Sequence, residues 1–306
     1  MRLRVVALAL IALALAPAAS ARPRLGIFGP IDRFASLTGQ QSTVGHVILA
    51  WNQLPNNALM SKLGEVPLLG FSMGQGAITP KQVAYGAGDS FLISLNQVAQ
   101  QWQGQIYFRP YGEMNGHWNS YCAYDASGRP RGPSNTTAMF RKAFARTYLI
   151  LHGGPKALLD AKLRKLGLPP VAQDLPSNPM PRVRVIWNPQ GYGSPDLAGN
   201  RAQAYYPGDA YVDVVGNDLY DIGFKAEWAA NDRLYAAHPN KPYAFVEWGL
   251  WGIDDPEFVR HMATFVRTHR RVELLSYFNA KRGSIFDLAS KPKSLAAYRS
   301  LIPKLG

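Results

Sequence analysis

The chain has 306 residues, of which 47% are hydrophobic and 17% are charged, and its formal net charge is +13. This length and composition suit one large globular domain with a sizeable core. Only one cysteine is present, Cys122, which excludes an intramolecular disulfide, so packing must stabilise the fold. The basic residues are mostly scattered and accompany no nucleic-acid motif. We therefore expect a solvated basic surface that attracts acidic polymers weakly, and no nucleic-acid partner.

The beginning of the chain has the pattern of a secretory signal peptide. Arg2 and Arg4 precede an apolar run over residues 5–15, and residues 17–21 read PAASA, a small-residue cleavage pattern that ends at Ala21. An uncleaved membrane anchor is the alternative, but the apolar run is shorter than the roughly 20 residues of a spanning helix. We therefore expect residues 1–21 to be a signal peptide. Residues 22–306 are then one exported domain, extracellular or periplasmic, without a membrane span.

Short runs of β-forming residues alternate with longer segments of helical character along the rest of the chain. The predicted strands cover residues 25–29, 46–51, 66–71, 105–109, 183–187, 212–219, 243–247 and 272–278. Helices are predicted at residues 80–103, 136–151, 224–237, 256–270 and 291–301. This alternation predicts a parallel sheet, and eight strands close a (β/α)8 barrel, or TIM barrel. In that fold the functional residues lie at the carboxyl ends of the strands.

One long segment interrupts the alternation. Residues 153–181 are rich in proline and end in the sequence PSNPMP. We expect this segment to form an excursion before the fifth strand, and we find no second domain and no internal repeat.

Two glutamates stand at the ends of predicted strands. Glu113 follows the fourth strand and Glu247 ends the seventh, so both should face the same end of the barrel. A retaining glycosidase needs two such carboxylates, a proton donor and a nucleophile, about 5 to 5.5 Å apart. Either glutamate alone could instead be a buried partner of Arg109. The position of both glutamates at strand ends, beside Trp, Asn and Gly residues, favours a role in the catalysis of glycoside hydrolysis.

Four motifs follow one another in the chain, and together they carry a family resemblance. They are Arg109-Pro110, Glu113-Met114-Asn115-Gly116 with Trp118, Pro207-Gly208-Asp209 followed by Asp218-Leu219-Tyr220, and Glu247-Trp248-Gly249. With these motifs the chain, over residues 25–278, resembles glycoside hydrolase family 26. The members of this family are retaining (β/α)8 enzymes, best known as β-mannanases.

The resemblance implies a role for each motif. Glu113 would be the general acid/base and Glu247 the nucleophile. Tyr220 would hydrogen-bond near the nucleophile, Asp218 would contact the sugar or the acid/base, and Trp118 would line the sugar subsite. The expected substrate is a polysaccharide of the β-1,4-mannan type, or its oligosaccharides, cleaved within the chain by a monomer without a cofactor.

Further substrate-binding residues are expected around these motifs. Arg109 should donate to Glu247 and keep it ionised, while Asn115 and His117 lie inside the acid/base motif. Flat aromatic rings stack on sugar faces, and those that end or follow predicted strands are expected in the cleft: Trp51, Trp187, Tyr192, Trp248 and Trp251. Trp102 and Trp228 fall on predicted helices and are expected in the core.

The sequence departs from the family pattern in two places. Gly112 stands where the family carries a histidine before the acid/base, and we expect it to leave space that faces the substrate. The eighth strand ends in Tyr277-Phe278-Asn279-Ala280, without the tryptophan that mannanases place there. Mannan as the substrate therefore does not follow from the motifs alone.

Several alternatives stay open at this point. The same machinery could act on mixed-linkage glucan, xylan or a bacterial exopolysaccharide, or the chain could be a non-catalytic carbohydrate-binding barrel. The presence of both Glu113 and Glu247 favours the enzyme. The six histidines show no ligand spacing, and no phosphate-binding glycine loop is present, so we expect neither a metal site nor a nucleotide cofactor.

Overall fold

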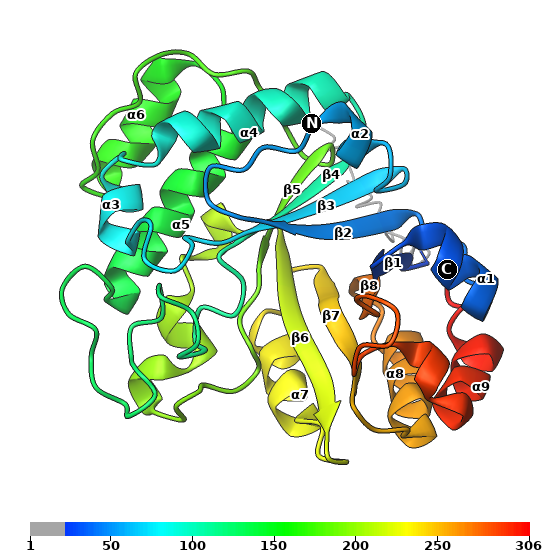
Figure 1. Cartoon of the computed structure of the whole chain (residues 1–306). Coiled ribbons are helices and arrows are strands. Elements are labelled where there is room, and N and C mark those ends of the chain that lie inside the picture. Colours follow the sequence, from blue (N-terminus) through cyan, green and yellow to red (C-terminus); the bar gives the residue numbers. More distant parts are fainter. Residues whose placement is uncertain (1–21) are drawn as a thin grey trace, which may run out of the picture.

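Eight parallel strands pair in sequence order and close into a barrel, which confirms the predicted (β/α)8 fold (Figure 1). The computed structural model describes residues 22–306, and the predicted signal peptide lies outside the described residues. The strands are β1 Arg24–Phe28, β2 Val44–Leu49, β3 Val66–Phe71, β4 Ile106–Pro110, β5 Val183–Trp187, β6 Val214–Ile222, β7 Tyr243–Trp251 and β8 Val272–Phe278.

Helices connect the strands and cover the outside of the barrel (Figure 1). They are α1 Ile31–Thr38, α2 Asn57–Met60, α3 Pro80–Ala84, α4 Asp89–Trp102, α5 Thr137–His152, α6 Lys156–Lys165, α7 Trp228–Ala237, α8 Pro256–Thr268 and α9 Pro292–Leu301. Short 3-10 turns lie at η1 Ala198–Asn200, η2 Ala202–Tyr205, η3 Asp209–Tyr211 and η4 Leu288–Ser290. In the described part of the chain, no helix is long and apolar enough to cross a membrane.

All eight strand predictions are close to the observed strands, and the largest difference concerns two strands at the site. The ranges of β3, β5 and β8 match the predicted ranges, whereas β6 and β7 continue to Ile222 and Trp251. Their pairing extends to the register pair Ile222 and Trp251. Glu247 therefore lies within β7 and not at its end.

The helix predictions missed several features. Helices α1 and α2, between the first three strands, were not predicted. The segment predicted as one helix over residues 80–103 is α3 and α4, separated by a turn in which Gly86 has a φ of 95°. A residue in the left-handed backbone conformation ends a helix, and glycine adopts this conformation without a steric cost. The proline-rich excursion over residues 153–181 contains α6, which was not predicted because only Leu159 and Leu163 are buried on it.

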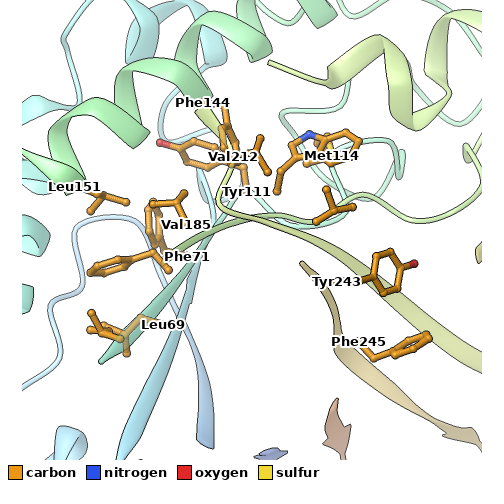
Figure 2. Close-up of a cluster of buried hydrophobic side chains, with 14 of the residues drawn as sticks. Leu69, Phe71, Tyr111, Met114, Phe144, Leu151, Val185, Val212, Tyr243 and Phe245 are labelled. Atoms are coloured by element: carbon orange, nitrogen blue, oxygen red, sulfur yellow. The ribbon is translucent and has the colours of Figure 1, made fainter. Parts of the chain in front are cut away.

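Alternating side chains divide the barrel into an interior and an outer layer, because successive residues of a strand point to opposite faces. A small apolar cluster fills the interior: Val44, Val66, Leu68, Tyr107, Ile186, Val214, Ala244, Val246 and Leu274. The much larger outer cluster packs between the strands and the helices. Figure 2 shows part of it, with Phe71, Tyr111 and Phe144 among its members. The Tyr111 hydroxyl lies 2.8 Å from Thr147 Oγ1 of α5 and ties the β4 end to that helix.

Candidate active site

A cavity of about 520 Å³ lies beside the carboxyl ends of β4 to β7, a size typical of ligand sites. Residues from four consecutive strand ends line it: Glu113, Trp118, Gln190, Tyr192, Asp218, Leu219, Tyr220, Ile222, Lys225, Glu227 and Trp251. Long β6 and β7 contribute the wall that contains Ile222 and Trp251. The sequence motifs around Glu113 and Asp218 therefore meet at one cavity.

A β-bulge in β7 decides which way Glu247 points. On β6, Asn217 and Asp218 are consecutive, but their register partners are Phe245 and Glu247, so β7 carries one extra residue, Val246. A bulge of this kind re-aims a side chain, and bulges are common beside active sites. Val246 belongs to the interior cluster, and Glu247, the next residue, also reaches interior partners.

Glu247 is held by two donors. Its Oε1 accepts a hydrogen bond of 2.9 Å from Arg109 Nη1, and its Oε2 accepts one of 2.7 Å from the Tyr220 hydroxyl. Glu247 is only 7% exposed. Both carboxylate oxygens are thus fixed in orientation, as a group that attacks a carbon atom from a fixed position requires.

Arg109 also binds Asp218, so one guanidinium serves two buried carboxylates. Its Nη2 donates to Asp218 Oδ2 while its Nη1 donates to Glu247. Asp218 and Glu247 are register partners on β6 and β7, and this neighbouring position explains why one side chain from β4 reaches both. Two acids and one cation leave this buried cluster with an excess of negative charge.

The pKa values of the cluster follow from burial and from this charge excess. Burial raises the pKa of Glu247 and the charge of Glu113 adds to the rise, whereas Arg109 and the Tyr220 hydrogen bond oppose it. Burial also raises the pKa of Asp218 well above its usual range, against the opposing charge of Arg109. Burial alone would lower the pKa of Arg109, but Asp218 and Glu247 raise it overall, so Arg109 stays charged.

The expectation that Gly112 leaves space that faces the substrate is wrong. A Cβ atom at Gly112 would lie 2.4 Å from Arg109 Cζ and 2.6 Å from its Nε and Nη2 atoms. The Arg109 guanidinium fills the space that a larger residue would need. A side chain at position 112 would therefore have to displace this buried guanidinium from its present position.

Glu113 lies in a turn after β4, in the left-handed region with a φ of 54°. Its backbone N–H donates to Asn188 O at 2.7 Å, and its carbonyl accepts from Gly116 N at 2.9 Å. Its carboxylate accepts two further bonds, from Gln190 Nε2 to Oε1 at 2.7 Å and from Trp118 Nε1 to Oε2 at 2.8 Å. This rare backbone conformation is thus stabilised from several sides, as is common at functional sites.

The site residues predicted from the sequence fall into three groups. Arg109, Glu113, Trp118, Asp218, Tyr220 and Glu247 come together in and directly beneath the cavity. Asn115 and His117 lie beside the cavity, and their side chains contact the loop that follows β5. Asn115 is buried, and its Nδ2 donates to Gln190 O and Tyr192 O at 2.9 Å. His117 Nδ1 lies 3.1 Å from Ser194 Oγ.

Trp187 and Trp248 form the third group, and the expectation that they line the cleft is wrong. Both are 0% exposed. Trp187 packs against Tyr206 and His238, and Trp248 stacks on Tyr298 of α9 with ring centroids 5.6 Å apart. Trp187 points outward by strand alternation. Trp248 points outward because the bulge turns Glu247 inward, so the next residue faces the helices.

The other aromatic predictions have mixed outcomes. Tyr192 and Trp251 line the cavity, as expected for cleft residues. Trp51 is partly buried against Phe91 instead. Trp102 and Trp228 pack against the main core, as predicted from their helical positions.

Gln190 is the site residue that the sequence analysis missed. It follows β5 in the segment Trp187-Asn188-Pro189-Gln190, and its side chain binds the Glu113 carboxylate. An amide just past a strand end was an available signal. The charged rim residues Lys225 and Glu227 were also missed, since they lie in an exposed loop without a motif. Within residues 22–306, no group of three or more His, Cys, Asp and Glu side chains is placed to hold a metal ion.

A family model and a curated protein match parts of this chain. The model of glycosyl hydrolase family 26 matches residues 185–283, the segment that contains β5 to β8 with Asp218, Tyr220 and Glu247. Endoglucanase H of Acetivibrio thermocellus is 23% identical over 232 residues, which are 71% of this chain and 22% of that protein. The chain thus spans less than a quarter of the length of this curated relative.

Solved structures share the barrel. The YdhT protein from Bacillus subtilis matches with a TM-score of 0.59 at 17% identity, over 90% of this chain and 84% of that chain. Bacillus subtilis mannanase man26 matches with a TM-score of 0.57 at 17% identity, over the same shares of the two chains. A double mutant of the Cellulomonas fimi endo-beta-1,4-mannanase matches with a TM-score of 0.59 at 16% identity, over 91% of this chain and 71% of that chain. At these identities the likeness establishes the fold.

Proposed function

We propose that this chain, which the matches above support as a member of glycosyl hydrolase family 26, is a secreted retaining endo-β-glycanase. Family membership supports glycoside hydrolysis as the reaction class and a polysaccharide as its substrate. The enzyme would act as a monomer after cleavage of the signal peptide near Ala21.

The proposed reaction uses the two glutamates in two steps. In the first, Glu113 donates a proton to the glycosidic oxygen while a Glu247 carboxylate oxygen attacks the anomeric carbon, so the glycosidic bond breaks and a glycosyl ester forms. In the second, Glu113 takes a proton from water, and that water displaces Glu247 from the anomeric carbon. The two carboxylates are regenerated in their starting protonation states.

One observation carries this proposal: Glu113 and Glu247 come from β4 and β7, and each is oriented by its own set of donors. Arg109 and Tyr220 hold Glu247, whereas Trp118 and Gln190 hold Glu113. Arg109 and Tyr220 favour the ionised form that a nucleophile needs. Asp218 also accepts a hydrogen bond from Arg109 and so helps to hold the Arg109 side chain in place.

The favoured substrate is a β-1,4-mannan. Its support is the fold shared with proteins described as mannanases, such as man26 and the Cellulomonas fimi enzyme. A second candidate is another β-glycan, such as mixed-linkage glucan, xylan or a bacterial exopolysaccharide. The match to a protein named Endoglucanase H favours a glucan among these.

Replacing the nucleophile tests the proposal. Glu247→Ala should abolish hydrolysis of an activated aryl β-glycoside, and azide should restore turnover and give a product of inverted configuration. Glu257→Ala is the matched control, since Glu257 is an exposed glutamate of α8 that pairs with Arg260, and it should keep full activity. Appreciable native activity in Glu247→Ala would contradict the assignment.

The substrate class is tested separately by measuring reducing ends released from soluble mannan, mixed-linkage glucan and xylan. We expect the largest release from mannan. Binding to these polymers without any release would favour the non-catalytic binding barrel instead.

A further inference from the structure

A second cavity of about 560 Å³ adjoins the candidate active site. Tyr192 and Glu227 line both cavities, so the two cavities lie side by side over the loops that follow β5 and β6. Its other wall comes from residues 191–203 and from α7, including Asp196, Arg201 and Arg233. A polymer that occupies the first cavity can therefore extend into the second.

The second cavity is coupled to the proton-donor side of the site. Tyr192 is two residues after Gln190, whose side chain binds Glu113, and its backbone carbonyl accepts a hydrogen bond from Asn115 Nδ2. The charges of Glu113 and Glu227 both contribute to the raised pKa of Tyr192, after the larger effect of burial. A sugar in the second cavity would thus be a further unit of a chain bound across Glu113.

Two guanidinium groups from separate elements converge on this second cavity. Arg201 precedes η2, and Arg233 lies on α7. Both side chains are exposed, and within residues 22–306 neither forms a hydrogen bond or an ion pair. Many other arginines are engaged, for example Arg146 with Asp89 and Arg184 with Glu273.

The backbones that carry these two arginines are well anchored. Tyr205 of η2 donates a hydrogen bond of 2.7 Å to Asn200 Oδ1, next to Arg201. On α7, Asn231 Oδ1 accepts from Asn217 Nδ2 of β6 at 3.0 Å and from the Tyr243 hydroxyl of β7 at 2.7 Å. A site whose charged groups stand on fixed elements loses less entropy on binding.

We propose that the second cavity binds a sugar that carries a carboxylate, so that this enzyme prefers a mannan-type β-glycan with acidic units over neutral mannan. This inference rests on the proposed function and adds the substrate class. A guanidinium fork matches a carboxylate with two parallel hydrogen bonds, and the unpaired forks of Arg201 and Arg233 leave both donors free. Asp196 and Glu227 also line the cavity, where their carboxylates offer hydrogen-bond acceptors to sugar hydroxyls.

Binding of two matched trisaccharides tests the proposal. β-1,4-Linked trimannuronate and mannotriose share a backbone and differ in the carboxylate at C6. Calorimetry is done in the Glu247→Ala variant, so that neither sugar is hydrolysed. We expect trimannuronate to bind about tenfold more tightly than mannotriose at low salt, with a smaller preference at high salt.

Substitutions then locate the preference. The double substitution Arg201→Ala and Arg233→Ala should abolish it, and the double substitution to Lys should retain part of it, because the charge remains and the fork is lost. Arg267→Ala is the control, since this exposed arginine of α8 lines a different surface cavity. It is compared with the single substitutions Arg201→Ala and Arg233→Ala, each of which also removes one positive charge. A preference that survives the double alanine substitution, or that Arg267→Ala abolishes equally, would overturn the proposal.

A 6-O-sulfated mannotriose identifies the kind of anion. Tighter binding of this sugar than of trimannuronate would overturn the carboxylate assignment. Equal binding of trimannuronate and mannotriose would overturn the acidic-substrate inference, while hydrolysis of neutral β-glycans by the wild-type enzyme would still support the proposed function. The two failures are therefore distinguishable.

Discussion

Arg109 is the residue on which the electrostatics of the site depend, because it lies between two buried acids. Breaking a buried ion pair by removing or displacing one partner leaves an uncompensated charge and is strongly unfavourable. The space around its guanidinium is correspondingly tight. Gly112 is in contact with it, and any side chain at position 112 must displace it.

Gly112→His should therefore damage the catalytic step itself. The histidine would push Arg109 away from Glu247 and Asp218, so we expect kcat/KM to fall by at least about 100-fold, or roughly 2.7 kcal/mol of transition-state stabilisation. The loss should appear on polysaccharides and on an activated aryl glycoside alike. Folding is checked by circular dichroism, and Gly112→Ala should give a smaller loss in the same direction. A changed ranking among β-glycans with unchanged aryl glycoside hydrolysis would show that Arg109 has room to move.

Trp118 combines an exposed ring with a hydrogen bond to Glu113, and two substitutions separate these contributions. Trp118→Ala removes both and should lower kcat/KM by at least about tenfold, or roughly 1.4 kcal/mol. Trp118→Phe keeps an aromatic face and loses only the Nε1 donor, so it should cause a smaller loss. Equal losses in steady-state kinetics would mean that the hydrogen bond, and not the sugar contact, accounts for the role of Trp118.

At the scale of the element, the bulge in β7 exchanges the expected positions of two neighbouring side chains. Val246 and Glu247 both reach the interior, and Trp248 turns outward into the core. Plain alternation after Val246 would have directed Trp248 inward and Glu247 outward. One inserted residue thus places the carboxylate in the site and an indole between β7 and α9.

Trp248→Ala should accordingly destabilise the fold. Removing a fully buried tryptophan that stacks on Tyr298 and meets Tyr277 should cost about 3–5 kcal/mol in the free energy of unfolding. Urea denaturation measures this loss. Trp118→Ala serves as the comparison, because Trp118 is 42% exposed and removal of its ring should change stability little. Similar losses from both substitutions would contradict the outward packing of Trp248.

At the scale of the whole molecule, a pair of acids joins the barrel wall to a surrounding helix. Asp221 lies near the end of β6, and Asp255 caps the amino end of α8 by accepting from Glu257 N at 2.9 Å. Burial raises the pKa of Asp221 to about 6, and a hydrogen bond and charge from Asp255 add to the rise. The folded protein therefore favours the protonated form of Asp221 more than the unfolded chain does.

Stability should depend on pH through this pair. The pKa of Asp221 is higher in the folded protein than its ordinary value of 3.8, so the folded state binds more protons between about pH 4 and pH 6. This contribution to stability is present below about pH 4 and is lost as the pH rises through 6. Asp221→Asn should raise the free energy of unfolding by about 1 kcal/mol at pH 7 and change it little at pH 4. Thermal unfolding at the two pH values checks this, and an equal effect at both would exclude titration of Asp221 as the cause.

The sequence by itself determined the barrel, and it predicted that Glu113 and Glu247 face the same end of it. Strands such as β3 and β5 are short apolar runs bounded by turn residues, and this pattern is local, so it can be read without tertiary information. The motifs around Glu113 and Glu247 lie after or within such strands. Their meeting at one end of the barrel follows from the parallel topology alone.

Only the tertiary structure decided how the side chains are aimed. The bulge at Val246 depends on the register between β6 and β7, which no single strand encodes. Because of this bulge, Trp248 lies in the core and not in the cleft, where the sequence predicted it. The space beside Gly112 is filled by Arg109, whose position is set by acids on two other strands. The convergence of Arg201 and Arg233 likewise brings together a residue that precedes η2 and a residue of α7. These features depend on distances between segments that are remote in sequence, and local patterns carry no information about such distances.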